Sequence, residues 1–434
     1  MTNRHLKTLE QVVSWRLCVG CGACVWVCPR KSVSLVDILD EGLHPVVDRD
    51  KCRNCGMCIK VCPGIELLHA PFPKATIPQL KEAWGPVLEV WEGYATDTEI
   101  RFKGSSGGVV TALSLFCLEQ KLMIGALEIG ADAMVPWQNV AVFSRNRTQL
   151  IACTGSRYSP AAPCEKLDWI EQAERSCVFI GKPCDVAALR KSQAINSTVD
   201  NKVGLAISIF CAGTPTTQGT KALLEAMGVE PKLVDEMRYR GYGWPGKVTV
   251  KVRGNDADVH QLSYSECWGK ILSNFGQFRC LICPDTTGEF ADIACGDPWH
   301  RKIEQSQQGY SLVLVRTERG REILHRAMQS GYLTLVPVQF STLPCSQKAL
   351  LNGRRNLFGR LFAMRLMGVP TPSFNGFSLL ENWCYLKVWS RLRSVLSMFW
   401  RIISEKLYRP RKYLSTTLKA DRGSVWPPAA TAIP

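Results

Sequence analysis

Eight cysteines near the N-terminus form two copies of one pattern. The run Cys-x2-Cys-x2-Cys-x3-Cys-Pro starts at Cys18 and again at Cys52, which makes an internal repeat with a period of 34 residues. This is the ligand spacing of bacterial ferredoxins, in which three close thiolates hold one 4Fe-4S cluster and the fourth holds the other cluster. Structural zinc prefers two Cys-x2-Cys pairs, so two complete copies disfavour zinc. The spacing predicts two clusters, one on Cys18, Cys21, Cys24 and Cys62 and the other on Cys52, Cys55, Cys58 and Cys28.

Small residues stand between these cysteines. Gly20, Gly22, Ala23 and Gly56 suit loops whose backbone amides turn toward sulfur, and such hydrogen bonds tune the potential of a cluster. We therefore expect the segment to carry electrons without catalysing a reaction itself.

Four further cysteines could bind a third cluster. Cys184 and Cys211 each follow a predicted strand, and Cys280 and Cys283 have ligand spacing, so the four thiols could converge at one sheet edge. The alternative is that Cys184 and Cys211 are small buried apolar residues, which is the usual state of a free cysteine. Both interpretations stay open at this point. We interpret five other cysteines as core or incidental residues: Cys117, Cys153, Cys177, Cys345 and Cys384.

Two segments of the middle of the chain are typical of phosphate sites. In the first, a Gly/Ser loop at residues 103–108 precedes a run at helical spacing, where free amides and the helix dipole favour an anion. A capped helix without a ligand is the alternative for this loop. The second, Gly181 to Arg190, follows a predicted strand and could meet a ligand at the carboxyl edge of a sheet.

The elements that must position these residues alternate between strand and helix. From Val87 to about Pro344, apolar runs such as 176–180, 203–210 and 311–316 are each followed by a helical pattern, and 241–253 resembles a hairpin insertion. The alternation favours an α/β or α+β fold with a mixed sheet. Prolines at 71, 73, 78 and 86 indicate a linker. We expect a small ferredoxin-like iron-sulfur domain at 1–80, a mixed-sheet domain at 81–350 and a basic helical tail at 351–434.

The order of the motifs resembles the beta subunit family of the deazaflavin-reducing (coenzyme F420) hydrogenases and dehydrogenases. The segments that carry the resemblance are Ser105–Gly108, Gly181–Arg190, Cys211–Pro215 and Cys280–Asp297, and it covers roughly residues 85–345. With the ferredoxin module in front, the chain looks like the members that pass electrons from reduced deazaflavin to membrane-bound or sulfite-reducing systems.

The resemblance implies an FAD, at least one 4Fe-4S cluster and hydride exchange between the flavin and a two-electron partner. The middle domain would then bind the flavin, and the clusters would pass electrons singly to a redox protein partner. The family also contains ferredoxin-dependent reductases, so a reductase of a small substrate, for example in surface-polysaccharide synthesis, is an alternative function. An electron-transfer adaptor without flavin is another. The residues that would hold the phosphate and neutralise it are Ser105, Ser106, Gly107, Gly108, Lys182 and Arg190.

Composition and charge indicate where in the cell the protein works. The chain has 434 residues, 20 Cys and a formal charge of +15. The N-terminus shows no apolar core or cleavage signal, so we expect a cytoplasmic protein whose cysteines bind metal, without disulfides. No uncharged apolar run reaches the roughly 18–20 residues of a membrane span. Residues 351–434 hold 14 Lys and Arg against three acidic residues, so the positive charge belongs mostly to the tail.

The tail contains an amphipathic segment at 386–403. Its apolar residues include Trp389, Leu396 and Trp400, and basic residues and serines occupy the other side at helical spacing. This pattern predicts a helix that lies on the inner face of an anionic cell membrane, or one whose apolar stripe docks on its own domain or a partner. Nucleic acid is disfavoured because no nucleic-acid-binding motif is present. We expect the last residues, 426–434, to be disordered.

Overall fold

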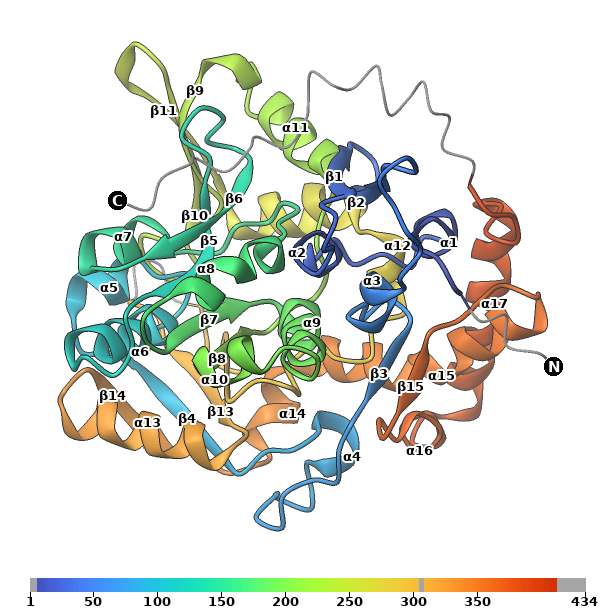
Figure 1. Ribbon diagram of the computed structural model, residues 1–434. Helices are drawn as coiled ribbons and strands as arrows, with labels where there is room; N and C mark the ends of the chain where they lie inside the picture. The colour runs from blue at the N-terminus through green and yellow to red at the C-terminus, as the bar shows by residue number, and fades with distance from the viewer. Residues whose placement is uncertain (1–5, 304–307, 412–434) are drawn as a thin grey trace.

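A mixed eight-stranded sheet forms the centre of the protein (Figure 1). The computed structural model describes residues 6–303 and 308–411. The strand order is β14-β4-β13-β12-β8-β7-β5-β6, in which β12, β8, β7 and β5 are mutually parallel and the other pairs are antiparallel. The bounds are β4 (Glu89–Ala95), β5 (Ala126–Ala131), β6 (Asn139–Ser144), β7 (Cys177–Gly181), β8 (Val203–Ile209), β12 (Ile293–Gly296), β13 (Ser311–Val315) and β14 (Leu333–Pro337).

Helices cover both faces of this sheet, which explains why its central strands are apolar along their length. Every residue of β13 is buried, as expected for a strand packed on two sides. One face packs against α6 (Val109–Glu119) and α13 (Glu318–Gln329). The other packs against α8 (Leu167–Gln172), α9 (Pro183–Gln193) and α10 (Ser197–Lys202) on one half, and against α4 (Lys81–Trp84), α14 (Thr342–Ser346) and α15 (Lys348–Leu366) on the other half. The mixed α/β fold predicted from the sequence is confirmed.

A three-stranded antiparallel sheet is inserted between β8 and β12. It consists of β9 (Val234–Arg238), β10 (Lys247–Val252) and β11 (Asn255–Ser263), in the order β11-β10-β9. It packs on α11 (Thr217–Ala226) and is followed by α12 (Phe278–Leu281). The predicted hairpin at 241–253 therefore covers β10 and the loop before it. Two short helices, α5 (Thr98–Lys103) and α7 (Arg147–Ala152), complete the middle part of the chain.

The N-terminal module contains α1 (Leu9–Ser14), α2 (Ala23–Trp26), β1 (Val33–Ile38), β2 (Gly42–Val47), α3 (Met57–Lys60) and β3 (Glu66–Leu68). It docks tightly on the central domain: the backbone NH of Cys164 donates to the carbonyl of Cys21 at 3.0 Å. Gly22 lies at this contact with a φ of 85°, and a Cβ there would stand 2.8 Å from the backbone nitrogen of Glu165. Only glycine allows both this conformation and this approach.

The C-terminal part packs on the rest of the chain. It contains α15, β15 (Ser373–Asn375), α16 (Leu379–Cys384) and α17 (Val388–Ser404), and β15 pairs in parallel with β3 of the N-terminal module. Helix α15 runs across residue 350, so the predicted boundary there falls inside a helix. Residues 69–80, where the other boundary was predicted, contain no helix or strand. The predicted disorder of 426–434 lies outside the described residues. Among residues 6–303 and 308–411, none of the helices has the length and apolarity that crossing a membrane requires.

A buried ion network connects the linker, the central domain and the C-terminal part. Glu289 accepts at 2.9 Å from Arg354 Nη1 on α15 and lies 2.9 Å from Nε2 of His69, while Arg354 Nη2 donates to the carbonyl of Phe377 at 2.8 Å. Burial raises the pKa of Glu289, but Arg354 and His69 outweigh burial and hold the pKa below its usual value. Glu289 is therefore ionised, and its charge needs both partners.

Replacing Arg354 should destabilise the fold. The variant Arg354→Met leaves the buried carboxylate of Glu289 with one partner fewer, and we expect a loss of about 3 kcal/mol in the free energy of unfolding. Urea unfolding followed by circular dichroism measures this loss. The matched control is Lys348→Met, which removes an exposed cation from the same helix and should change stability little. Equal stability of both variants would contradict the network's role.

Candidate iron-sulfur and cofactor site

The parallel strands bring distant loops to one edge of the sheet. Gly181 of β7 pairs with Ser208 of β8, Cys295 of β12 pairs with Ile209, and Gly296 pairs with Leu312 of β13. The segments that follow β7, β8 and β12 therefore begin side by side at the carboxyl edge. Ligand sites of open α/β sheets form at this edge. The segments contain Lys182, Cys184, Cys211 and Asp297.

The first predicted cluster set is brought together in the N-terminal module. A small cavity is lined by Cys18, Cys21, Cys24 and, from the second copy of the repeat, Cys62. Burial and, to a lesser extent, the nearby Cys18 raise the pKa of the Cys62 thiol to about 12. Thiolates in such a place are stable when a metal offsets their charge, because metal ligation requires the deprotonated form. The donor set and the cavity therefore fit an iron-sulfur cluster.

The second predicted set lies next to it. Burial raises the pKa of Cys58, and Cys55 and Cys52 raise it further because they lie nearby. Cys28 and Cys58 belong to one apolar cluster between the two copies. The same turn recurs in each copy of the repeat: the NH of Gly20 donates to Cys18 Sγ at 3.4 Å, and that of Asn54 donates to Cys52 Sγ at 3.5 Å. Backbone amides thus turn toward sulfur, as the sequence predicted.

The four remaining candidate ligands also converge. Burial raises the pKa of Cys184 most, and Cys211 and Cys283 add to that effect because they lie close by. Burial likewise raises the pKa values of Cys211 and Cys283 to about 12, and Cys280 contributes to both. The NH of Thr214 donates to Cys280 Sγ at 3.4 Å. The structure thus gathers these four thiols at the carboxyl edge, and it buries or half-buries each of them.

None of these sets is arranged for a single metal ion. Across the part of the chain that the structure describes, no three His, Cys, Asp or Glu side chains close around one point. A cubane cluster has a different requirement, because each of its four thiolates binds a different iron and the sulfurs stand further apart. This requirement differs from that of zinc, whose ligands share one ion.

Arg279 lies between two of the cysteine sets. Its guanidinium lowers the pKa of Cys62 on one side and of Cys280 and Cys283 on the other, although burial dominates each of these pKa values. The side chain is 4% exposed; Nη1 donates to the carbonyl of Ile282 at 3.0 Å, and Nε has no hydrogen-bond partner. A buried NH without an acceptor is costly, so it indicates a missing acceptor such as a cluster sulfide.

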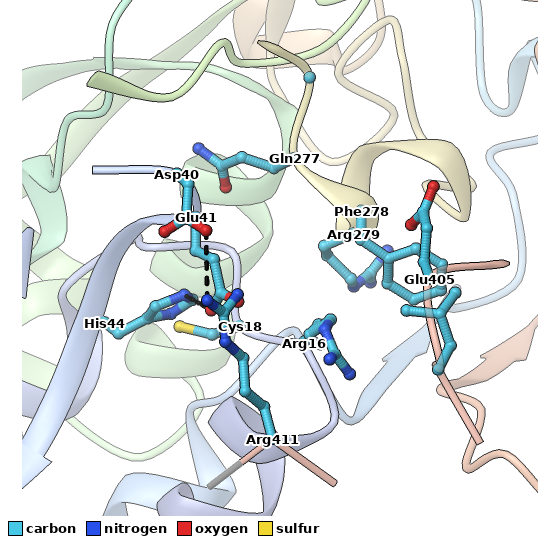
Figure 2. A pocket seen from close by; sticks show the side chains of 12 residues that line it. Arg16, Cys18, Asp40, Glu41, His44, Gln277, Phe278, Arg279, Glu405 and Arg411 are labelled. Carbon is cyan, nitrogen blue, oxygen red and sulfur yellow. Dashed lines mark hydrogen bonds and ion pairs between the residues drawn. The ribbon is translucent and has the colours of Figure 1, made fainter. Parts of the chain in front are cut away.

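A cavity of about 230 Å³ opens beside Arg279 and Cys18. Figure 2 shows the two side chains on different sides of this space, with Arg16, Asp40 and Arg411 around it. The cavity connects the region of the first cysteine set with a charged rim. It is the place where a redox partner or solvent ions could approach the first set.

The glycine-rich loop at 104–108 has a different role from the one predicted. The NH of Gly107 donates to Ser311 Oγ at 2.9 Å, and Ser106 Oγ lies 3.0 Å from the same hydroxyl, so neither group is directed toward a ligand. Gly108 caps α6 with a φ of 75°. Only Ser105 touches a cavity wall, because its hydroxyl accepts from the NH of Ser156. The loop's glycines serve close packing of α6 against β4 and β13.

The two predicted cationic residues are both engaged internally. Lys182 Nζ lies 2.7 Å from Asp185 Oδ1 and donates to the carbonyl of Ala161 at 3.1 Å. Arg190 lies at the other end of α9, where Nη2 donates to Asp292 Oδ2 at 3.1 Å, just before β12 begins. Lys182 thus stands at the carboxyl edge with its charge already offset, and Arg190 is not brought to that edge at all.

A pocket of about 230 Å³ beside Ser105 was not predicted. It is lined by the loop 152–157, by the end of β5 and by Arg238 of β9. Arg238 Nη2 donates to the carbonyls of Lys103 and Thr154 at 2.6 Å each, while Nε is buried without a partner. Glycine at 155 has a φ of 113°. The Thr154-Gly155-Ser156-Arg157 sequence, a turn with small polar residues and an arginine, was the signal that could have found it.

An aromatic cluster adjoins this pocket through Arg240. The buried guanidinium forms a two-point ion pair with Asp297, with Nη1 to Oδ2 at 2.7 Å, and Trp244 Nε1 donates to the same carboxylate at 2.8 Å. Tyr264 and Trp299 stack with centroids 5.3 Å apart beneath Arg240. The two rings, Arg240 and Asp297 thus pack on one another at this end of the sheet. Asp297 was part of a recognised segment and Trp299 follows it, whereas Trp244 and Tyr264 come from the chain between β8 and β12.

Comparison with known proteins identifies the family. Residues 90–167 match the N-terminal model and residues 174–341 the C-terminal model of the coenzyme F420 hydrogenase/dehydrogenase beta subunit, and residues 12–69 match a 4Fe-4S dicluster domain. The chain belongs to this beta subunit family. The family and the N-terminal dicluster domain predicted from the sequence are thus confirmed.

Several proteins of known type are similar. The coenzyme F420 hydrogenase subunit beta of Methanothermobacter thermautotrophicus is 26% identical over 66% of this chain and 99% of that protein. The coenzyme F420-dependent sulfite reductase of Methanocaldococcus jannaschii is 24% identical over 73% of this chain and 46% of its own length. A chain of the F420-reducing [NiFe] hydrogenase complex from Methanosarcina barkeri shares 22% identity at a TM-score of 0.49, covering 66% of this chain and 96% of that one, and no argument rests on this last likeness.

These relatives are oxidoreductases or their subunits, which confirms the interpretation of the chain as an oxidoreductase. The cysteine ligands, the cofactor-binding residues and the third cluster are not tested by the comparisons. They stay predictions, which the geometry described above supports to different degrees.

Iron content distinguishes two clusters from three. If Cys184, Cys211, Cys280 and Cys283 hold a cluster, the reconstituted protein should contain about twelve iron atoms per chain, and Cys283→Ala should lower this to about eight. Cys177→Ala, which removes a buried cysteine outside the three sets, is the control and should keep the full content. Eight iron atoms in the unchanged protein would exclude the third cluster.

Charge removal at Arg279 should lower two reduction potentials. A reduced cluster carries more negative charge, which the guanidinium stabilises. Arg279→Gln should therefore lower the reduction potentials of the clusters next to Cys62 and Cys280 by an amount on the order of tens of millivolts. An EPR-monitored redox titration measures the shift. Arg279→Lys keeps the charge and should retain most of the potential. An unchanged titration curve for Arg279→Gln would show that the residue only packs.

Proposed function

We propose that the protein transfers electrons between reduced coenzyme F420 and a one-electron carrier, through an FAD and three 4Fe-4S clusters. The observation that carries this proposal is the convergence of Cys184, Cys211, Cys280 and Cys283 at the carboxyl edge, between the cofactor pocket and the dicluster domain. A chain that only passed electrons within the dicluster domain would need no such set. The names of the similar hydrogenase and sulfite reductase both specify F420, which favours it as the two-electron partner.

The residues at the carboxyl edge fit a dinucleotide in two parts. Arg238, with its unpaired buried Nε, and the backbone of Gly155 would bind the phosphate groups, because a guanidinium and a backbone amide favour an anion. Tyr264 and Trp299, which stack on each other, would form an aromatic wall beside a planar ring. When bound, FAD supplies the conversion between two-electron and one-electron transfer. The protein's own contribution is to orient the ring and to exclude water with its aromatic residues.

The cysteine sets follow one another from this edge toward the protein surface. Arg279 interacts with thiols of the third set and of the first set, so these two sets are neighbours. The second set adjoins the first through the apolar contact that Cys28 and Cys58 share with Cys24. Electrons arriving at the carboxyl edge would thus reach the N-terminal module, where we propose that a redox protein partner accepts or supplies them.

Two measurements test this function together: the binding of FAD and the rate of oxidation of different electron donors. Anaerobically reconstituted protein should bind FAD, which flavin fluorescence measures. It should also oxidise reduced F420 faster than it oxidises NAD(P)H or reduced ferredoxin, which the absorbance of the clusters measures. Arg238→Gln should weaken FAD binding at least about tenfold, since a charge-assisted hydrogen bond contributes roughly 1.5–3 kcal/mol. Arg253→Gln, an exposed cation of the same inserted sheet, is the control.

Two outcomes would favour the alternative functions. Protein that contains its clusters but never binds flavin is an electron-transfer adaptor. Protein that binds flavin but accepts electrons only from reduced ferredoxin is a reductase of another small substrate. Either result contradicts the proposal.

A further inference from the structure

Helix α17 is docked on the protein by a face that combines Ser394 of the predicted polar side with apolar residues. The buried residues of this helix are Ser394, Met398 and Ile402, at a spacing of four. They face α15 and the core beneath it, which also contains Val12, Trp15 and Leu361. Val395 and Phe399 of the predicted apolar face also pack against this core, so that part of the face docks on the protein's own domain, as one alternative from the sequence expected.

The opposite face of the same helix carries an apolar stripe that no residue of 6–303 or 308–411 covers. Trp389 is 82% exposed and Trp400 is 74% exposed. The intervals of three and four residues place these side chains in one line along the helix. We call this set the α17 stripe: Trp389, Leu392, Leu396, Trp400 and Ile403, all among the exposed large apolar residues.

The outward direction of the stripe is fixed by specific contacts. Ser394 Oγ accepts from Trp383 Nε1 of α16 at 3.0 Å. A Cβ on Gly359 of α15 would stand 2.0 Å from this hydroxyl, so the two helices approach closely at a glycine. Rotating α17 to bury the stripe would bring large side chains against Gly359. Figure 1 shows α17 at the outer edge of the molecule, with α15 on its inner side.

The surroundings of the stripe are positively charged. Residues 386–411 contain seven Lys or Arg and one acidic residue, Glu405, which is paired with Arg401 at 2.9 Å. Lys387, Arg393 and Arg409 are exposed along or beyond the helix. An apolar stripe that is flanked by cations is complementary to a surface that offers anionic head groups above an apolar layer.

We propose that the α17 stripe binds to an anionic lipid bilayer, with the helix lying parallel to the membrane surface. Two tryptophans about 16 Å apart along the axis suit the boundary between head groups and acyl chains. The stripe lies on a single helix at the surface, so it is convex, and its residues line none of the cavities described above. That shape fits a planar interface. This inference does not depend on the proposed electron-transfer reaction.

Vesicle binding by the full reconstituted chain tests the proposal. The protein should co-sediment with vesicles of phosphatidylglycerol and phosphatidylcholine, bind pure phosphatidylcholine more weakly, and lose affinity as salt rises. The double variant Trp389→Ser and Trp400→Ser should bind anionic vesicles at least about tenfold more weakly. Arg393→Gln with Arg409→Gln should weaken binding at low salt only.

The control variant removes apolar surface elsewhere. Met134→Ser combined with Val336→Ser alters two exposed side chains far from α17 in the sequence and should leave vesicle binding unchanged. Brominated lipids should quench tryptophan fluorescence in the unchanged protein and less in the double tryptophan variant, which separates a binding defect from misfolding.

Three results would overturn the proposal. The first is a failure of the unchanged protein to bind anionic vesicles. The second is equal binding by the double tryptophan variant. The third is a change in oligomeric state, measured by light scattering, when the tryptophans are replaced and vesicle binding is unaffected. That result would assign the stripe to a second copy of the chain.

Discussion

A buried thiolate is stable only when a metal or another cation offsets its charge, and this constraint applies to the buried cysteines that we propose as cluster ligands. The whole architecture meets this constraint. Cys62 must cross from the second copy of the repeat to reach Cys18. Cys184 must come from the connection between β7 and β8, and Cys211 and Cys280 from two distant parts of the connection between β8 and β12. Parallel strands achieve the latter because their carboxyl ends share one edge.

Fixing these sets relative to one another requires contacts far from the cysteines. Gly22 lets the N-terminal module approach the central domain, and β15 pairs with β3 to hold the module from the other side. Glu289, six residues after Cys283, is bound by His69 of the linker and by Arg354 of α15. The matched family segments end at residue 341, so α15 and the helices after it lie beyond them, yet they stabilise the loop that carries the third set.

The C-terminal helix shows why an amphipathic pattern does not name its own partner. Helix α17 has apolar residues on two sides, Met398 and Ile402 on one and Trp389 and Trp400 on the other. Hydrophobic transfer energy alone would favour burying the larger side. The close approach at Gly359 and the bond between Trp383 and Ser394 decide the opposite orientation, because large side chains do not fit there. A surface with more exposed apolar area is the consequence.

The sequence by itself determined the features that depend on spacing along the chain. Cysteine intervals, the alternation of strands and helices, the family and the position of α17 all follow from local pattern, because thiolate geometry and side-chain periodicity act over a few residues. The tertiary structure alone decided which groups are available to a ligand. Gly107 is engaged by Ser311, which lies 204 residues further along the chain and which no local rule identifies. The partner of Lys182, Asp185, is by contrast a local one, three residues on in α9. Arg190 is carried to the far edge by the length of α9, and the inserted sheet delivers Arg238 to the pocket in its place. Satisfying every buried polar group is a property of the complete fold, so no segment could specify it alone.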